Sequence, residues 1–176
     1  YYYVRLSKIK YREEMDRLLE NAKITSLENI KNAEKNFSVG SFILIQNAWE
    51  EILPFNDEPI WVNYKNNRTN LYSLIKGKAN EYVNRLRIQA SSKIKKIRTF
   101  IDRDNSILID VFDSKNDKPL NGIPIQIKSP YGEQSMYSNQ NGLIEYSFQN
   151  INKASALTIE YKFDYYKLYR DLEQSN

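Results

Sequence analysis

The sequence predicts an α+β fold, in which an N-terminal antiparallel helical hairpin or three-helix unit precedes a small antiparallel β-sandwich. Apolar residues in the first half of the chain recur at three- and four-residue steps, as they do on one face of a helix. Beyond about residue 92 they alternate with polar residues, as in half-buried strands. We therefore expect a helical domain over residues 1–92 and a β-sandwich domain with a C-terminal extension over residues 93–176.

The first helix is predicted to be long, because no Gly or Pro occurs within residues 1–38. Its apolar face comprises Met15, Leu18, Leu19, Ala22, Ser26, Ile30, Ala33 and Phe37. Gly40 is expected to end this helix, since Gly is common just beyond a helix C-terminus.

A second, shorter helix is expected over about residues 41–53, and it ends before Pro54. Its apolar face comprises Phe42, Ile45, Trp49 and Ile52. Residues 54–67 are rich in Pro and Asn, and we expect them to form a loop.

The third helix is predicted over about residues 71–86, where the helical spacing of apolar residues is clearest. Thr69 or Asn70 is expected to cap its start. Gly77 lies inside this helix at a cost in stability, which close packing against another helix would explain.

Four alternating runs predict strands of the sandwich, at residues 106–112, 123–127, 143–148 and 157–163. Turn-forming clusters separate these runs, at residues 115–119, 129–132 and 139–142. Short strands at regular spacing with such turns between them are typical of an antiparallel sandwich.

Composition restricts the chemistry. The chain has 176 residues, a net charge of +4, and neither Cys nor His. Disulfides and thiolate metal sites are thereby excluded, and the commonest general base and metal ligand is missing. We therefore expect a protein that is not an enzyme and has no cofactor. No apolar run approaches the roughly 20 residues that span a bilayer. Because the chain begins at Tyr1 instead of Met, we expect it to be processed or trimmed.

Three motifs of the second half have a familiar order. They are Val111-Phe112-Asp113, Pro119-Leu120-Asn121-Gly122-Ile123-Pro124-Ile125 and Asn141-Gly142-Leu143-Ile144. Together they resemble the bacterial immunoglobulin-like or transthyretin-like modules of cell-surface proteins. The resemblance implies an immunoglobulin-like β-sandwich, in which Asn141-Gly142 forms a tight hairpin turn.

A second set of residues lies in the helical part, namely Gly40-Ser41-Phe42, Ile45, Trp49, Ile52 and Pro54. It resembles one degenerate tetratricopeptide-like unit, with Ile45 and Ile52 at positions where that repeat has Ala. The order of the two parts resembles the C-terminal region of bacterial envelope lipoproteins related to the Helicobacter twenty-kilodalton lipoprotein family. This resemblance implies an extracytoplasmic setting, periplasmic or associated with the outer membrane.

The function that we expect is that of a non-catalytic structural or protein-interaction module. Its partners would be other proteins of a cell-envelope assembly, with no small-molecule substrate. Aromatic residues are favoured at protein interfaces, and the candidate contact residues are Tyr1, Tyr2, Tyr3, Trp61, Tyr64, Tyr165, Tyr166 and Tyr169.

A basic stretch supports an alternative, in which residues 85–103 bind nucleic acid or an anionic surface. The stretch carries Arg85, Arg87, Lys93, Lys95, Lys96, Arg98 and Arg103, with few acidic residues between them. A solvated face near the end of a helix would have the same composition.

Carboxylates around the first predicted strand support a third alternative, a carboxylate-dependent glycosidase. They are Asp102, Asp104, Asp110 and Asp113. We favour a simpler explanation, in which Asp102 and Asp104 begin a turn and Asp110 faces solvent on a strand. Whether the turn from Asp113 to Asp117, with Asn116 and Asp104 or Asn105, binds Ca²⁺ stays open, since Asp and Asn also favour turns for local reasons.

Overall fold

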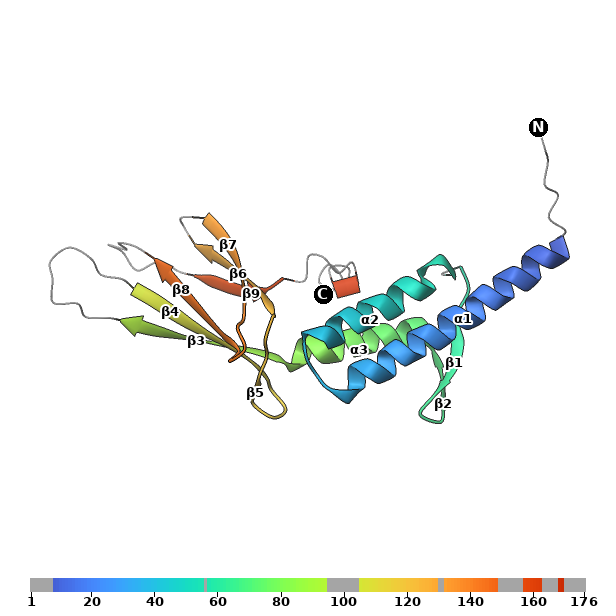
Figure 1. Cartoon of the computed structure of the whole chain (residues 1–176), viewed down its shortest axis with the longest axis horizontal. Coiled ribbons are helices and arrows are strands. Elements are labelled where there is room, and N and C mark those ends of the chain that lie inside the picture. The colour runs from blue at the N-terminus through green and yellow to red at the C-terminus, as the bar shows by residue number, and fades with distance from the viewer. Residues whose placement is uncertain are drawn as a thin grey trace, which may run out of the picture. The chain divides into compact units, whose positions relative to one another are not determined.

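The computed structural model of the chain describes residues 8–55, 57–94, 105–129, 132–148, 157–162 and 168–169 (Figure 1). The chain divides into two compact units, which we call the helical unit (Tyr1–Asn80 with Tyr166–Asn176) and the sheet unit (Glu81–Tyr165). Helices precede antiparallel sheets, which confirms the predicted α+β class. The division falls after residue 80 and not near residue 92, and the chain is already a strand from Leu86.

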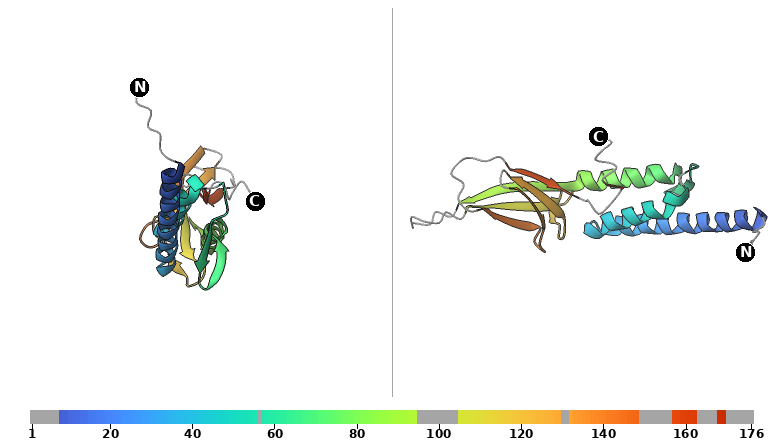
Figure 2. Two further views of the ribbon diagram at one scale, coloured as in Figure 1. Left: turned by 90° about the vertical axis from the view of Figure 1, so that its right-hand side faces the viewer. Right: turned by 90° about the horizontal axis from the view of Figure 1, so that it is seen from above.

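Two helices, α1 (Lys8–Lys35) and α2 (Val39–Ile52), form the predicted hairpin of the helical unit. They pack through the C-terminal half of α1, where the buried residues are Ala22, Ser26, Ile30 and Ala33. The buried Ser26 hydroxyl donates to the carbonyl oxygen of Ala48 in α2 at 2.9 Å, so its polar group is satisfied. The N-terminal part of α1 runs on beyond the end of α2 (Figure 2).

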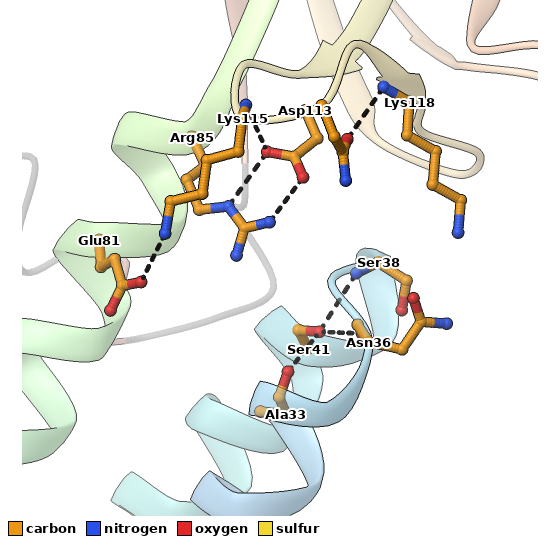
Figure 3. Close-up of polar contacts among 10 residues, drawn as sticks. Ala33, Asn36, Ser38, Ser41, Glu81, Arg85, Asp113, Lys115 and Lys118 are labelled. Carbon is orange, nitrogen blue, oxygen red and sulfur yellow. Dashed lines mark hydrogen bonds and ion pairs between the residues drawn. The ribbon is translucent and has the colours of Figure 1, made fainter.

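Gly40 was expected to end α1, but it lies in the first turn of α2. Polar groups make the connection between the two helices instead (Figure 3). The Ser38 N–H donates to Ser41 Oγ at 3.2 Å. The Ser41 hydroxyl in turn reaches the carbonyl oxygens of Asn36, at 2.9 Å, and Ala33, at 3.1 Å. These contacts satisfy backbone groups that helix ends leave without partners.

The prediction of a loop over residues 54–67 is wrong, because half of this segment has regular structure. A 3₁₀ turn, η1 (Leu53–Phe55), follows α2, and a hairpin of β1 (Trp61–Tyr64) and β2 (Asn67–Asn70) follows it. Lys65 and Asn66 form the two-residue turn with φ of 49° and 67°. Two positive φ values are what a tight hairpin turn needs, and Asn tolerates them better than most residues.

Helix α3 (Leu71–Arg85) has the predicted bounds to within one residue. Asn70 caps it, since Asn70 Oδ1 accepts the Ser73 N–H at 3.1 Å. Gly77 does not serve close packing, because it is exposed and a Cβ added there would meet no atom within 4 Å.

The C-terminal residues that the structure describes belong to the helical unit and not to the sheet domain in which we expected them. Leu168 and Tyr169 are both buried. The Leu168 N–H donates to Gln46 Oε1 at 3.0 Å, and the Tyr169 hydroxyl donates to the carbonyl oxygen of Phe42 at 3.2 Å. The Tyr169 and Phe42 rings lie 5.5 Å apart, so Leu168 and Tyr169 pack against α2.

The sheet unit contains two antiparallel sheets. The first comprises β3 (Leu86–Ile94), β4 (Asn105–Asp113), β5 (Lys118–Pro119) and β8 (Leu143–Phe148), with β4 paired to the other three. The second has the order β7-β6-β9, with β6 (Pro124–Ser129) between β7 (Gly132–Tyr137) and β9 (Thr158–Tyr161). The four predicted runs each form a strand, whereas β3, β5 and β7 were not predicted.

The core of the sheet unit consists of aliphatic side chains from both sheets, which are Ile109, Val111 and Ile144 from the first and Ile123, Ile125 and Ile127 from the second. At one end of β8 the backbone of Gly142 lies against β4. The Val111 N–H donates to the Gly142 carbonyl oxygen at 2.7 Å, and the Gly142 N–H donates to that of Asn139 at 2.8 Å. Gly142 has a φ of 68°, which explains the glycine in this turn.

Candidate functional site

The carboxylate of Asp113, at the end of β4, is the centre of a buried polar cluster (Figure 3). The guanidinium of Arg85 donates to it twice, from Nε to Oδ1 at 3.1 Å and from Nη2 to Oδ2. The Lys115 N–H donates to Oδ1 at 3.1 Å. Arg85 is the main reason that the pKa of Asp113 lies below its usual value, against the opposing effect of burial. Asp113 therefore joins the last turn of α3 to the β4–β5 turn, within the sheet unit.

The contacts of Asp113 also concern whether the turn from Asp113 to Asp117 could bind Ca²⁺. Asp113 is held by Arg85, and Asn116 Oδ1 accepts the Lys118 N–H at 3.0 Å, so both oxygen donors already have partners. Over the described ranges, no three Asp, Glu, His or Cys residues are grouped so that they could hold a metal ion. The Asp and Asn residues here form the turn, which is their commonest local role.

The expected group of carboxylates is not brought together in the part of the chain that the structure describes. Asp110 and Asp113 are three residues apart on β4, so they lie on opposite faces of the sheet. Asp113 is 1% exposed and paired, whereas Asp110 is half-buried on the other face. Asp102 and Asp104 lie outside the described residues. The described pair therefore does not form the facing carboxylates that glycoside hydrolysis needs.

A shallow depression of about 380 Å³ lies beside Asp110. Eight residues line it: Gln89, Asp110, Val111, Phe112, Asp117, Pro119, Asn141 and Gly142. None of them is basic. The depression is open to solvent, and we assign it no ligand.

A second polar cluster lies in the helical unit, around Glu34 of α1. Its Oε1 accepts from Lys65 Nζ at 3.0 Å and pairs with Lys78 Nζ at 2.7 Å. Burial would raise the pKa of this carboxyl, but the ammonium groups of Lys78 and Lys65 outweigh burial and hold it at about 2. The cluster links α1, the β1–β2 turn and α3, so we assign it a structural role.

The aromatic residues expected to make contacts have different surroundings. Trp61 is 49% exposed, with the Arg68 guanidinium 5.2 Å from its ring centre. Tyr64 is buried, and burial is the main cause that raises the pKa of its phenol. Tyr169 is buried and packs inside the helical unit against Phe42. The other residues expected to make contacts, Tyr1, Tyr2, Tyr3, Tyr165 and Tyr166, lie outside the described residues.

The basic stretch is only partly described. Arg85 holds Asp113, so a phosphate could take it only by leaving that carboxylate buried without its partner. Arg87 is exposed on β3, with its guanidinium 5.5 Å from the ring centre of Phe112. The backbone of Lys93 lies in β3. The remaining members, Lys95, Lys96, Arg98 and Arg103, lie outside the described residues.

An exposed apolar surface on α1 was not among the predicted contacts. Ile9 is 70% exposed, Tyr11 58% and Leu18 41%. The buried residues of α1 begin only at Ala22. The sequence contained a signal for this surface, because the apolar face of the first helix is much longer than the second helix that could cover it.

Among the helices of the described residues, none combines the length and the apolar character that crossing a bilayer requires. No protein-family model, curated protein or solved structure matches this chain. The contacts and surfaces described above are therefore the basis for a functional conclusion.

Proposed function

We propose that this chain is a non-catalytic protein-interaction module of a bacterial protein associated with the cell envelope. The observation that carries the proposal is the apolar face of the N-terminal half of α1, which we call the α1 face. On it Tyr11 and Leu18 are exposed, and Met15 and Leu19 are half-buried. The envelope setting and the extracytoplasmic location follow from the resemblance to envelope lipoproteins, and the α1 face supports the interaction role.

The lengths of the two helices define this face. At 1.5 Å per residue, the 28 residues of α1 extend about 42 Å, and the 14 residues of α2 extend about 21 Å. The first half of α1 therefore has no helix of the described part of the chain beside it. An isolated helix of about this size is only marginally stable in water. A partner that covers the α1 face would stabilise the helix while burying its apolar side chains.

The test is site-specific photo-cross-linking in the cells that produce the full protein. A benzophenone amino acid replaces Tyr11 on the α1 face, and the matched control replaces Glu13, which is exposed on the opposite side of the helix. We expect a discrete cross-linked product in the envelope fraction from position 11 and not from position 13. Adding Leu18→Asp, on the same face, should remove the product.

Equal cross-linking from both positions would contradict the proposal, because it would reflect random encounters. The same holds for a product that survives Leu18→Asp, or for one that appears only in the cytoplasmic fraction.

A further inference from the structure

Strand β3 is a long edge strand. It has nine residues and pairs with β4 on one side, and no described strand lies on its other side. The other outer strands, β7, β8 and β9, have four to six residues. Proteins usually protect a long edge, because its unpaired backbone groups form a template for another chain.

The pairing of β4 shows which backbone groups of β3 point outward. The Ser114 N–H donates to the Arg85 carbonyl oxygen, so residues 85 and 114 form a hydrogen-bonded pair in the continued β3–β4 register. Such pairs alternate along an antiparallel ladder. Residues 87, 89, 91 and 93 therefore bond to β4, and the N–H and C=O groups of Ile88, Ala90 and Ser92 face the open edge.

The opposite side of β4 gives an independent check of this assignment. The Val111 N–H bonds to Gly142, just beyond the β8 register. Odd-numbered residues of β4 therefore bond toward β8, and even-numbered residues bond toward β3. Both observations place the same groups of β3 at the open edge.

The side chains of β3 define what could pair there. Ile88 and Ala90 share a face with the buried Val111 and Ile109 of β4, yet Ile88 is half-buried and Ala90 is exposed. The apolar inner face of this sheet therefore continues to the edge. Arg87 is exposed on the other face, and the sequence of β3 includes Lys93 and no acidic residue.

We propose that the edge of β3 binds an extended acidic segment of the partner protein, which adds to the sheet as a further strand. This inference rests on the proposed interaction function and specifies a second contact for it. Backbone groups of Ile88, Ala90 and Ser92 bond the added strand. Apolar residues of that strand face Ile88 and Ala90, and an acidic residue faces the exposed Arg87.

The charge of β3 disfavours a second copy of this chain at the edge. Its sequence carries Arg87 and Lys93 and no acidic residue, and like charges on adjoining strands destabilise a sheet. The charge of β3 therefore favours an acidic partner over self-association.

The experiment uses the full chain and a labelled probe peptide, Ile-Glu-Val-Thr-Val-Thr-Val-Glu-Ile, which matches the nine residues of β3. Fluorescence anisotropy measures its affinity, and a control peptide carries Lys in place of both Glu. We expect Ala90→Pro to weaken binding at least tenfold, because it removes an outward N–H while leaving the bonds to β4. The matched control is Ser135→Pro on β7, which removes an outward N–H from another edge and should leave binding unchanged.

Two further measurements keep the inference open to refutation if Ala90→Pro does not fold. Ala90→Lys places a charge on the inner face of the edge and should also weaken binding at least tenfold. Arg87→Glu should weaken binding of the acidic peptide about fivefold and strengthen binding of the Lys peptide to a similar extent. On peptide binding, hydrogen exchange should slow at Ile88, Ala90 and Ser92 and not at Ser135.

Equal binding of both peptides, or binding unaffected by Ala90→Pro and Ala90→Lys, would overturn the inference. If cross-linking from position 11 is nevertheless observed, the proposed interaction function stands, and only the binding of an acidic segment at the edge of β3 is refuted. If cross-linking from Tyr11 fails while the β3 variants behave as expected, the α1 face is refuted and the edge stands.

Discussion

Asp113 shows how a residue that resembles a catalytic or metal-binding carboxylate is explained by its neighbours. Its side chain is almost fully buried and depends on Arg85 for its charge to be compensated. Removing one partner of such a pair leaves the other without compensation, which is among the more damaging single changes in a protein.

We predict that Asp113→Asn destabilises the sheet unit by about 3 kcal/mol. Asn keeps the size of the side chain and can still accept the Lys115 N–H, but it leaves the Arg85 guanidinium without a counter-charge. Hydrogen exchange of β3 and β4 amides measures the effect. Asp117→Asn, at an exposed position of the same turn, is the control and should change the hydrogen exchange of these amides little. Similar protection in both variants would contradict the stabilising role that we assign to the ion pair of Arg85 and Asp113.

Glu34 gives a prediction about pH. Its pKa is about 2 in the folded protein and about 4.5 in an unfolded chain. A carboxyl whose folded pKa is lowered contributes stability above its unfolded pKa, and this contribution is lost as the pH falls from about 4.5 to 2. We expect a loss of about 2 kcal/mol in that window, less than the full pKa difference implies, because the side chain is 21% exposed and partly screened.

Tryptophan fluorescence is a suitable measure of this loss, since Trp49 and Trp61 are the only tryptophans of the chain and both belong to the helical unit. Urea unfolding should show the decline between pH 4.5 and 2. In Glu34→Gln, the free energy of unfolding should fall by about 2 kcal/mol less over this pH range than it does in the unchanged protein. If the variant and the unchanged protein lose the same stability, another group is responsible.

At the scale of single elements, two glycines allow a matched comparison. A Cβ on Gly142 would lie 2.5 Å from the Val111 carbonyl oxygen, at a φ that L-residues rarely adopt. We expect Gly142→Ala to destabilise the sheet unit by at least about 2 kcal/mol. Gly77→Ala, in the exposed part of α3, should stabilise the helical unit by about 1 kcal/mol, because Ala favours the helix. Thermal unfolding followed by circular dichroism measures both changes in stability. If both variants are stabilised, or both destabilised, this explanation is contradicted.

Elements were predicted well where local pattern and local chemistry agreed. The strand around Ile109 alternates clearly, and Asn70 both ends a strand and caps α3. The hairpin of β1 and β2 was missed because its turn, Lys65-Asn66, lacks the glycine that usually marks such turns. Strand β3 was missed because Leu86 continues the spacing of α3, and Gln, Ala, Ser and Lys are compatible with a helix. Its strand conformation comes from pairing with β4, which a local pattern does not reveal.

At the scale of the whole molecule, the sequence predicted helices followed by sheets, which the two units confirm. It did not predict which distant residues meet. Arg85 and Asp113 are 28 positions apart, and Tyr169 packs on Phe42 across 127 positions. Arg85 and Tyr169 were both expected to make contacts at the surface, because charge and aromatic character alone do not distinguish an exposed side chain from one with a partner inside the protein. The edge of β3 likewise exists only once the sheet has formed.

The turn at Asn141-Gly142 also has a consequence for how the protein ages chemically. An Asn followed by Gly is prone to lose its side-chain amide, because the unhindered nitrogen of the next residue attacks the amide carbon and closes a ring. Here that nitrogen is occupied, since the Gly142 N–H donates to the Asn139 carbonyl oxygen at 2.8 Å. The same backbone contacts that hold the turn against β4 therefore protect Asn141 from deamidation for as long as the sheet stays folded.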